Sequence, residues 1–171
     1  KLTVSLWARH DDVSPTGVDT LFQLGYNTDY RTKLSLSSGA LKFHAHGDTT
    51  AVDIPFSPTA GAWHHYAMVY DEDATNDYSI YVDGVLIGSH PALDMFFDDS
   101  SLNKKFYFGG WDVFSGGNVT GGRDYFEGQM DEIRVYREAK TQPEIQALMH
   151  TYSTEDFATD NLRAYWPMNA Q

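Results

Sequence analysis

Hydrophobic and polar residues alternate most clearly along the segment 63–89. Residues 77–83 have the two-residue period of a strand with one solvated face. Asp83-Gly84 offers two positions that tolerate positive φ, which predicts a tight hairpin. The run 63–70 is apolar or aromatic at both alternating sets of positions, which predicts an interior strand. Three adjacent antiparallel strands bury a face only against a second sheet, so the pattern predicts a sandwich.

The other segments predict further short strands between turns rich in glycine, proline and aspartate. These strands are predicted at 2–8, 20–25, 33–36, 40–46, 51–54, 106–109, 127–137 and 162–168. The strand at 106–109 reads as buried, and the glycine-rich segment 115–122 as a flexible loop. Thr141 and Glu144 form a capping box before one short helix at 143–149. The sequence therefore predicts an all-β fold, a two-sheet antiparallel jelly-roll sandwich with one short helix in the C-terminal half.

The composition limits the classes of function that the chain can have. Its 171 residues are expected to form a single domain, 1–171, because no linker divides them. With 24 acidic against 12 basic residues the net charge is −12, which opposes nucleic-acid binding. No run approaches the roughly 20 apolar residues of a membrane-spanning helix, so no membrane insertion is expected. Because the chain has no cysteine, it has no disulfide and no cysteine nucleophile.

Candidate catalytic groups do not form a recognisable motif. Glycoside hydrolysis needs two carboxylates about 5 to 9 Å apart, and Glu127, Asp131 and Glu132 are the nearest approach to such a pair. Regular strand alternation places Asp131 on the face opposite Glu132. Neither a phosphate-binding glycine motif nor a nucleophile elbow is present. We therefore expect a protein that is not an enzyme, with glycoside hydrolysis as the remaining catalytic alternative.

Four segments in chain order carry a resemblance to a known family. They are SLWAR at 5–9, WHHYAMVYD at 63–71, YVDG at 81–84 and FEGQMDEIRVYREAKTQPEIQALM at 126–149. Together they resemble the laminin G-like and pentraxin group of concanavalin A-like jelly rolls, over nearly the whole of 2–168. The group's usual first strand has no counterpart ahead of residues 3–7. The segment 162–166 is expected either to fill that gap or to begin another repeat.

The resemblance implies where a ligand site would lie. Pentraxins bind calcium with acidic and amide side chains from two loops, and the corresponding residues here are Asn27, Asp29, Asp112 and Asp124. Aromatic residues in or beside these loops could stack on sugar rings or anchor the loops to the core: Tyr26, Tyr30, Trp111, Phe114 and Tyr125.

The function expected from the resemblance is that of a non-catalytic, lectin-like carbohydrate-binding module that binds Ca²⁺. Such a module belongs to a larger secreted or cell-surface protein, and its ligand is a polysaccharide or glycan. A structural or adhesive repeat that binds a cell-surface protein is the alternative, because one fold supports many functions.

Calcium is expected to stabilise the folded domain through the predicted loop site. An ion that binds only the folded state raises stability by mass action. Calcium chloride should therefore raise the melting temperature, and a chelator should reverse the increase. Asp112→Ala should remove most of the increase. The same change at Asp73, which lies in the separate acidic segment 71–73, should leave it in place. Differential scanning fluorimetry checks this, and a wild-type melting temperature that calcium does not change would contradict it.

Overall fold

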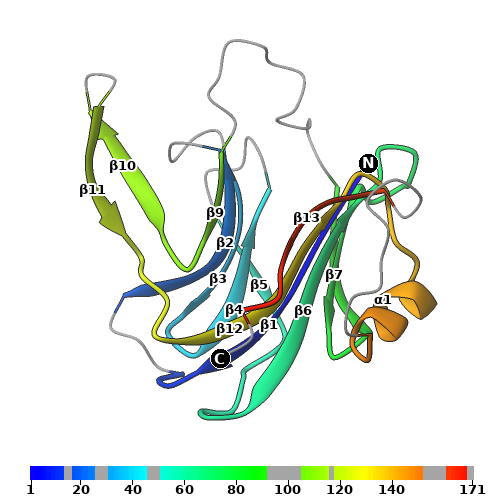
Figure 1. The fold of residues 1–171 in the computed structure, drawn as a ribbon, viewed down its shortest axis with the longest axis horizontal. Helices are drawn as coiled ribbons and strands as arrows, with labels where there is room; N and C mark the ends of the chain where they lie inside the picture. The colour runs from blue at the N-terminus through cyan, green and yellow to red at the C-terminus, as the bar shows by residue number, and fades with distance from the viewer. Residues whose placement is uncertain are drawn as a thin grey trace. The chain divides into compact units, whose positions relative to one another are not determined.

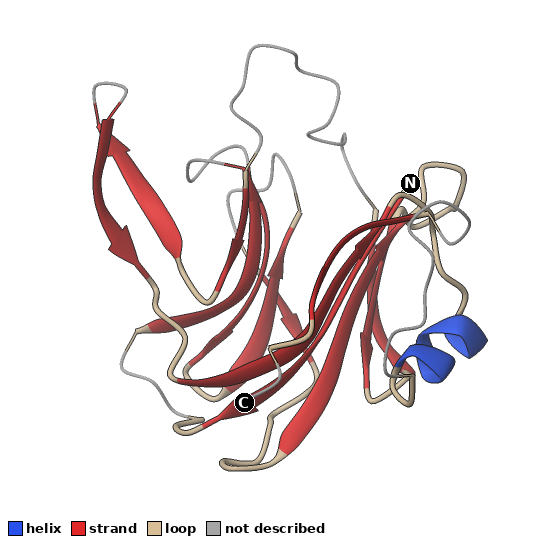
Figure 2. Ribbon diagram, in the orientation of Figure 1, coloured by secondary structure: helices blue, strands red, loops and turns tan. Residues whose placement is uncertain are grey.

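The computed structural model describes residues 1–13, 17–25, 31–45, 51–91, 105–115, 118–151 and 161–168. For residues 31, 111–115 and 118–123 it describes the backbone alone. The described strands form antiparallel sheets of six, five and two strands, and the described helix is α1 (Figures 1 and 2). The chain divides into a first compact unit of residues 1–9, 62–91 and 129–171 and a second of residues 10–61 and 92–128. No described helix has the length and apolar character needed to cross a membrane.

The first unit is built on the six-stranded sheet, in the order β13-β12-β1-β6-β7-β8. Its strands are β1 (Leu2–His10), β6 (Trp63–Tyr70), β7 (Tyr78–Val82), β8 (Val85–His90), β12 (Gly128–Tyr136) and β13 (Leu162–Trp166). β6 lies between β1 and β7, which confirms the interior strand predicted at 63–70. Asp83 and Gly84 join β7 to β8 with φ values of 50° and 72°, which confirms the predicted hairpin.

The helix α1 (Gln142–Leu148) confirms the predicted helix and its capping box. The backbone N–H of Thr141 donates to Glu144 Oε2 at 2.7 Å, which provides a partner for an amide that no helix carbonyl can reach. Ile145 is fully buried and packs against Val69 of β6 and Tyr81 of β7. Strand alternation predicts a solvated Tyr81, but the helix covers that face of the sheet and Tyr81 is buried.

The C-terminal strand pairs within the chain. β13 is antiparallel to β12, from Ile133 opposite Trp166 to Tyr136 opposite Leu162. Leu162 is fully buried in a cluster with Tyr136 and Leu148. Of the two alternatives for 162–166, pairing within this chain is the one that the structure shows, although its neighbour is β12 and not β1.

The second unit contains the five-stranded sheet, in the order β5-β4-β3-β2-β9, and the two-stranded sheet β10-β11 (Figure 1). Its strands are β2 (Val18–Gly25), β3 (Arg31–Ser37), β4 (Ala40–His44), β5 (Val52–Ile54), β9 (Phe106–Phe108), β10 (Trp111–Ser115) and β11 (Asn118–Arg123). The segment 118–122, predicted as part of a loop, is in fact strand, because its glycines still pair with β10 through their backbone. β9 is an edge strand, so Phe106 is exposed and not buried as predicted.

Gly84 should be the more sensitive of two glycines that share a left-handed backbone. A Cβ at Gly84 would lie 2.7 Å from Gln146 Cγ on α1, whereas a Cβ at Gly61, with φ of 76°, would meet nothing within 4 Å. Gly61→Ala should therefore cost about 1 to 2 kcal/mol from the left-handed backbone alone. Gly84→Ala should lower the free energy of unfolding further, because α1 must shift. Urea unfolding of both variants checks this, and equal losses would show that α1 does not constrain the turn.

Candidate functional site

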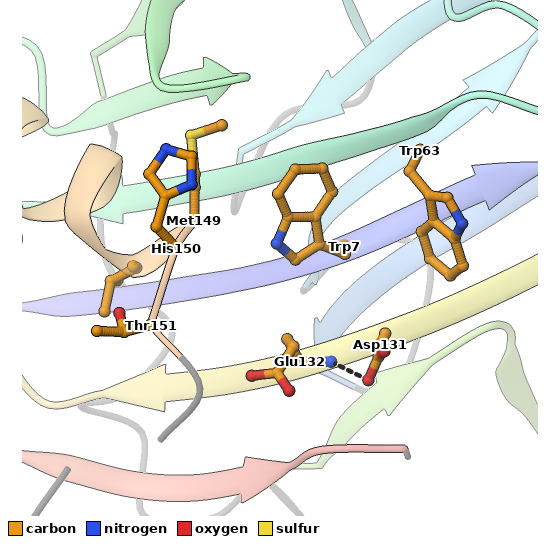
Figure 3. Close-up of a pocket in the computed structure, with 8 residues that line it drawn as sticks. Trp7, Trp63, Asp131, Glu132, Met149, His150 and Thr151 are labelled. Atoms are coloured by element: carbon orange, nitrogen blue, oxygen red, sulfur yellow. Dashed lines mark hydrogen bonds between the residues drawn. The ribbon is translucent and has the colours of Figure 1, made fainter. Parts of the chain in front are cut away.

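A pocket of about 370 Å³ lies on the first unit, beside the end of α1 (Figure 3). We call it the tryptophan pocket, and its described lining includes Trp7, Trp63, Asp131, Glu132, Met149 and His150. The register of β1 and β6 places Trp7 opposite His65 and Arg9 opposite Trp63. The two tryptophans therefore stand two positions apart on adjacent strands and share one face of the sheet.

The two indole rings stand near each other over this face, as Figure 3 shows. Trp63 is 40% exposed, whereas Trp7 is more buried and meets the fully buried His65 edge to face, with 5.5 Å between ring centres. Burial, reinforced by the charge of Arg134, lowers the pKa of His65 to about 4, so this imidazole is neutral at neutral pH. Trp7 is thus supported by a neutral ring, while Trp63 presents part of its ring to solvent.

Asp131 and Glu132 both line the tryptophan pocket. The prediction that they lie on opposite faces of a strand is therefore wrong. Glu132 has φ of 50°, a left-handed conformation that is strained in a residue with a Cβ. This conformation breaks the two-residue period of β12 and directs the Glu132 backbone N–H to Asp131 Oδ1 at 2.7 Å. Two neighbouring carboxylates can then reach one pocket.

Arg134 is fully buried and fixes the Glu132 side chain. Its Nη2 donates to Glu132 Oε2 at 2.5 Å and to the Thr151 carbonyl at 2.6 Å. The Tyr165 hydroxyl donates to the same Glu132 oxygen at 2.8 Å. Glu132 is 7% exposed, and its Oε1 has no hydrogen-bond partner among the described residues. A buried acceptor without a partner leaves a hydrogen bond unmade, and a donor that reaches it through the pocket would supply that bond.

A second pocket, of about 300 Å³, lies in the second unit, and we call it the acidic pocket. Its described lining is Asp12, Gly17, Val18, Asp19, Asp124, Tyr125 and Glu127. Asp19 is 3% exposed, and its Oδ2 has no partner in the described part of the chain. Burial raises the pKa of Asp19 to about 6. The charges of Glu127 and Asp12 add to this rise, and a hydrogen bond from the Glu127 backbone partly offsets it.

The predicted calcium ligands fall only in part within the described residues. Asn27 and Asp29 lie outside them, and Asp112 lies on β10, where the backbone alone is described. Asp124 lines the acidic pocket, and its Oδ2 lies 2.6 Å from Nζ of the buried Lys33. Within the described ranges, no group of three His, Cys, Asp or Glu side chains is placed to hold a metal ion. The calcium site stays a prediction.

The predicted sugar-stacking residues are likewise only partly described. Tyr26 and Tyr30 lie outside the described residues. Trp111 and Phe114 lie on β10, where the side chains are not described. Tyr125 is exposed and lines the acidic pocket together with Asp124, so the structure brings these two predicted site residues together.

Sequence reasoning missed Trp7 and Trp63 as candidate ligand residues. Both lie in segments with strong strand patterns, 2–8 and 63–70, where an aromatic residue is expected in the core. Their proximity depends on the register of β1 against β6, which joins residues more than 50 positions apart. The sequence gives the position of each tryptophan within its strand. That position identifies the two as neighbours only when the register of β1 against β6 is known.

A family model of laminin G type, described as the concanavalin A-like lectin/glucanases superfamily, matches residues 1–146. A search of curated proteins found no significant match.

Solved structures share the fold at low sequence identity. A Bacteroides ovatus protein described as carbohydrate-binding is 21% identical with a TM-score of 0.71, and the match covers 97% of this chain and 44% of that one. The CBM40 module of a Ruminococcus gnavus IT-sialidase, bound to α2,3-sialyllactose, is 17% identical with a TM-score of 0.65 and coverages of 86% and 81%. A heptameric SAP-like pentraxin from Limulus polyphemus is 17% identical with a TM-score of 0.59 and coverages of 85% and 67%.

These matches confirm the predicted all-β jelly roll and the predicted resemblance to laminin G-like domains and pentraxins. The chain spans less than half the length of the Bacteroides ovatus protein. Sequence identities of 17 to 21% establish a shared fold. Because one fold supports many functions, the function has to follow from the residues of the site.

The raised pKa of Asp19 predicts a pH-dependent stability. Because this pKa is 3.8 in the absence of the fold and about 6 within it, the folded protein binds the proton more tightly than the unfolded chain. The resulting stabilisation is complete below about pH 4 and is lost as the pH rises through about 6. Asp19→Asn, which stays uncharged, should therefore be more stable than the wild type at about pH 7.5 and lose this advantage near pH 4.

Urea unfolding in the presence of a chelator measures both differences. Asp53→Asn is the matched control, because it removes the same charge from an exposed side chain that pairs with Lys42. That variant should not gain stability at neutral pH. Equal gains in the two variants would show that net charge, and not the burial of Asp19, sets the effect.

Proposed function

The chain belongs to the concanavalin A-like lectin/glucanases superfamily, and from this premise we propose that it is a non-catalytic module that binds carbohydrate in the tryptophan pocket. The observation that carries the proposal is that two indole rings and the unpartnered Glu132 Oε1 line one pocket. Indole faces stack on the apolar faces of sugar rings, and carboxylate oxygens accept hydrogen bonds from sugar hydroxyls. The pocket offers both kinds of contact.

Proteins with the same fold support this proposal. The Bacteroides ovatus protein is described as carbohydrate-binding, and the Ruminococcus gnavus module was solved with a bound sialyllactose. We further propose that this chain is part of a secreted or cell-surface protein, where polysaccharides and glycans are accessible. Calcium at the predicted loop residues belongs to the same proposal and is tested separately by its effect on melting.

The hydrogen bonds of the carboxylates favour binding over hydrolysis. Hydrolysis by a carboxylate pair requires one group to donate a proton while the other attacks or activates water. Glu132 Oε2 accepts hydrogen bonds from Arg134 and Tyr165. Asp131 Oδ1 accepts one from the backbone of Glu132. Both side chains therefore act as acceptors within the fold, which suits them to hold sugar hydroxyls.

Removal of one pocket tryptophan should weaken glycan binding. A glycan array identifies the ligand, and isothermal titration calorimetry then measures its affinity with calcium and with a chelator. Trp63→Ala should lower the affinity about ten-fold or more, because a stacked aromatic ring contributes on the order of 1 kcal/mol beyond its buried area. Trp166→Ala is the matched control: Trp166 is 42% exposed on β13 and is not among the described lining of the pocket.

The control variant should bind as the wild type does, and circular dichroism should show that both variants fold. An unchanged affinity in Trp63→Ala would contradict the assignment to the tryptophan pocket. If the wild type binds no glycan on the array, the carbohydrate proposal fails and a structural or adhesive role is favoured.

A further inference from the structure

We propose that the ligand of the tryptophan pocket is a sugar with a positively charged amine, namely a glucosamine unit without its acetyl group. This inference rests on the proposed function and narrows it to one chemical class. It follows from three observations. Carboxylates line the pocket, the buried Arg134 is already bonded within the fold, and Glu132 Oε1 has no partner among the described residues.

The described lining of the pocket is rich in negative charge. It contains the carboxylates of Asp131 and Glu132 but no lysine or arginine. His150, which is exposed, is its basic side chain. The chain as a whole carries a net charge of −12, which adds a long-range attraction for cations. An anionic sugar would therefore meet repulsion in the pocket.

Arg134 cannot reverse this preference. Its guanidinium is fully buried and donates to Glu132, to the Thr151 carbonyl and, at 3.4 Å, to the Leu148 carbonyl. These bonds pair the charge of Arg134 with Glu132. They compensate Glu132 but leave the half-buried Asp131 without a described cationic partner. A ligand carboxylate would lie near Asp131 with no counter-charge, whereas a ligand ammonium would supply one.

An ammonium group suits three kinds of group in the residues that line the pocket. It can donate a hydrogen bond to Glu132 Oε1, which has no partner among the described residues. It can place its charge beside Asp131, and it can lie over the faces of Trp7 and Trp63, which attract cations. A neutral hydroxyl would satisfy only the first of these. An N-acetyl group would remove the charge, so acetylation of the ligand should weaken binding.

Calorimetric titration of the whole chain with three probes tests the inference. The probes are a glucosamine tetramer, an N-acetylglucosamine tetramer and 3′-sialyllactose, at about pH 6, where an amine is largely protonated. The glucosamine tetramer should bind about ten-fold more tightly than its acetylated form. Added salt should reduce this preference, because screening weakens the charge term. The sialylated sugar should bind most weakly.

Asp131→Asn is the decisive variant. Its side-chain oxygen can still accept the hydrogen bond from the Glu132 backbone, so the local conformation is kept while the charge is lost. The preference for the glucosamine tetramer should then fall to about the level of the acetylated tetramer. Asp53→Asn, the same change on an exposed side chain of the second unit, should keep the wild-type preference.

The outcomes separate this inference from the function on which it rests. If both tetramers bind equally, or if sialyllactose binds most tightly, and Trp63→Ala weakens that binding, the charge selection is overturned while carbohydrate binding in the pocket stands. If Asp131→Asn keeps the full preference, the selection does not come from this pocket and the inference is overturned. If no sugar binds, both the inference and the proposed function fail.

Discussion

The buried ion pair between Arg134 and Glu132 is the interaction on which the first unit depends. A buried charge costs several kcal/mol unless it is paired and its remaining hydrogen-bonding groups are satisfied. Arg134 meets most of this requirement by donating to Glu132 and to two carbonyls at the end of α1. Tyr165 brings β13 into the same network. One guanidinium therefore joins β12, β13 and the end of the helix, and residues of β12 and of the helix end line the tryptophan pocket.

This network explains how Glu132 keeps a strained backbone. A residue with a Cβ in the left-handed region costs on the order of 1 to 3 kcal/mol and persists only where its surroundings require it. Bonds from Arg134 and Tyr165 hold one carboxylate oxygen of Glu132, and the other oxygen stays unpartnered in the described structure. The network thus fixes the orientation of the Glu132 carboxylate at the pocket wall, and the proposed ligand would not have to order it on binding.

The acidic pocket of the second unit has a different electrostatic character. Asp124 is compensated by the buried Lys33, but Asp19 is buried beside the like charges of Glu127 and Asp12. In the tryptophan pocket the buried carboxylate has its own cation, whereas here a buried carboxylate is repelled by its neighbours. The first arrangement positions an acceptor for a ligand. The second lowers the stability of the folded state at neutral pH, and a proton at Asp19 relieves that cost.

The sequence by itself determined the features that depend on neighbouring residues. The Asp83-Gly84 turn and the capping box at Thr141 formed as predicted, because each is set within a few residues. The same local reasoning, with the family resemblance, correctly identified the fold class. It also failed where backbone pairing alone makes a strand, as in β11.

Only the tertiary structure decided the tryptophan pocket. Trp7 and Trp63 meet because β1 and β6 pair in one particular register, and a sequence pattern does not state which distant strands pair or how. Asp131 and Glu132 share the pocket because contacts from Arg134 and Tyr165 hold a left-handed residue inside a strand, against the period that the sequence shows. The first depends on strands more than 50 residues apart, and the second on the distant contacts of Tyr165 to Glu132 and of Thr151 to Arg134, which form only when the chain is folded.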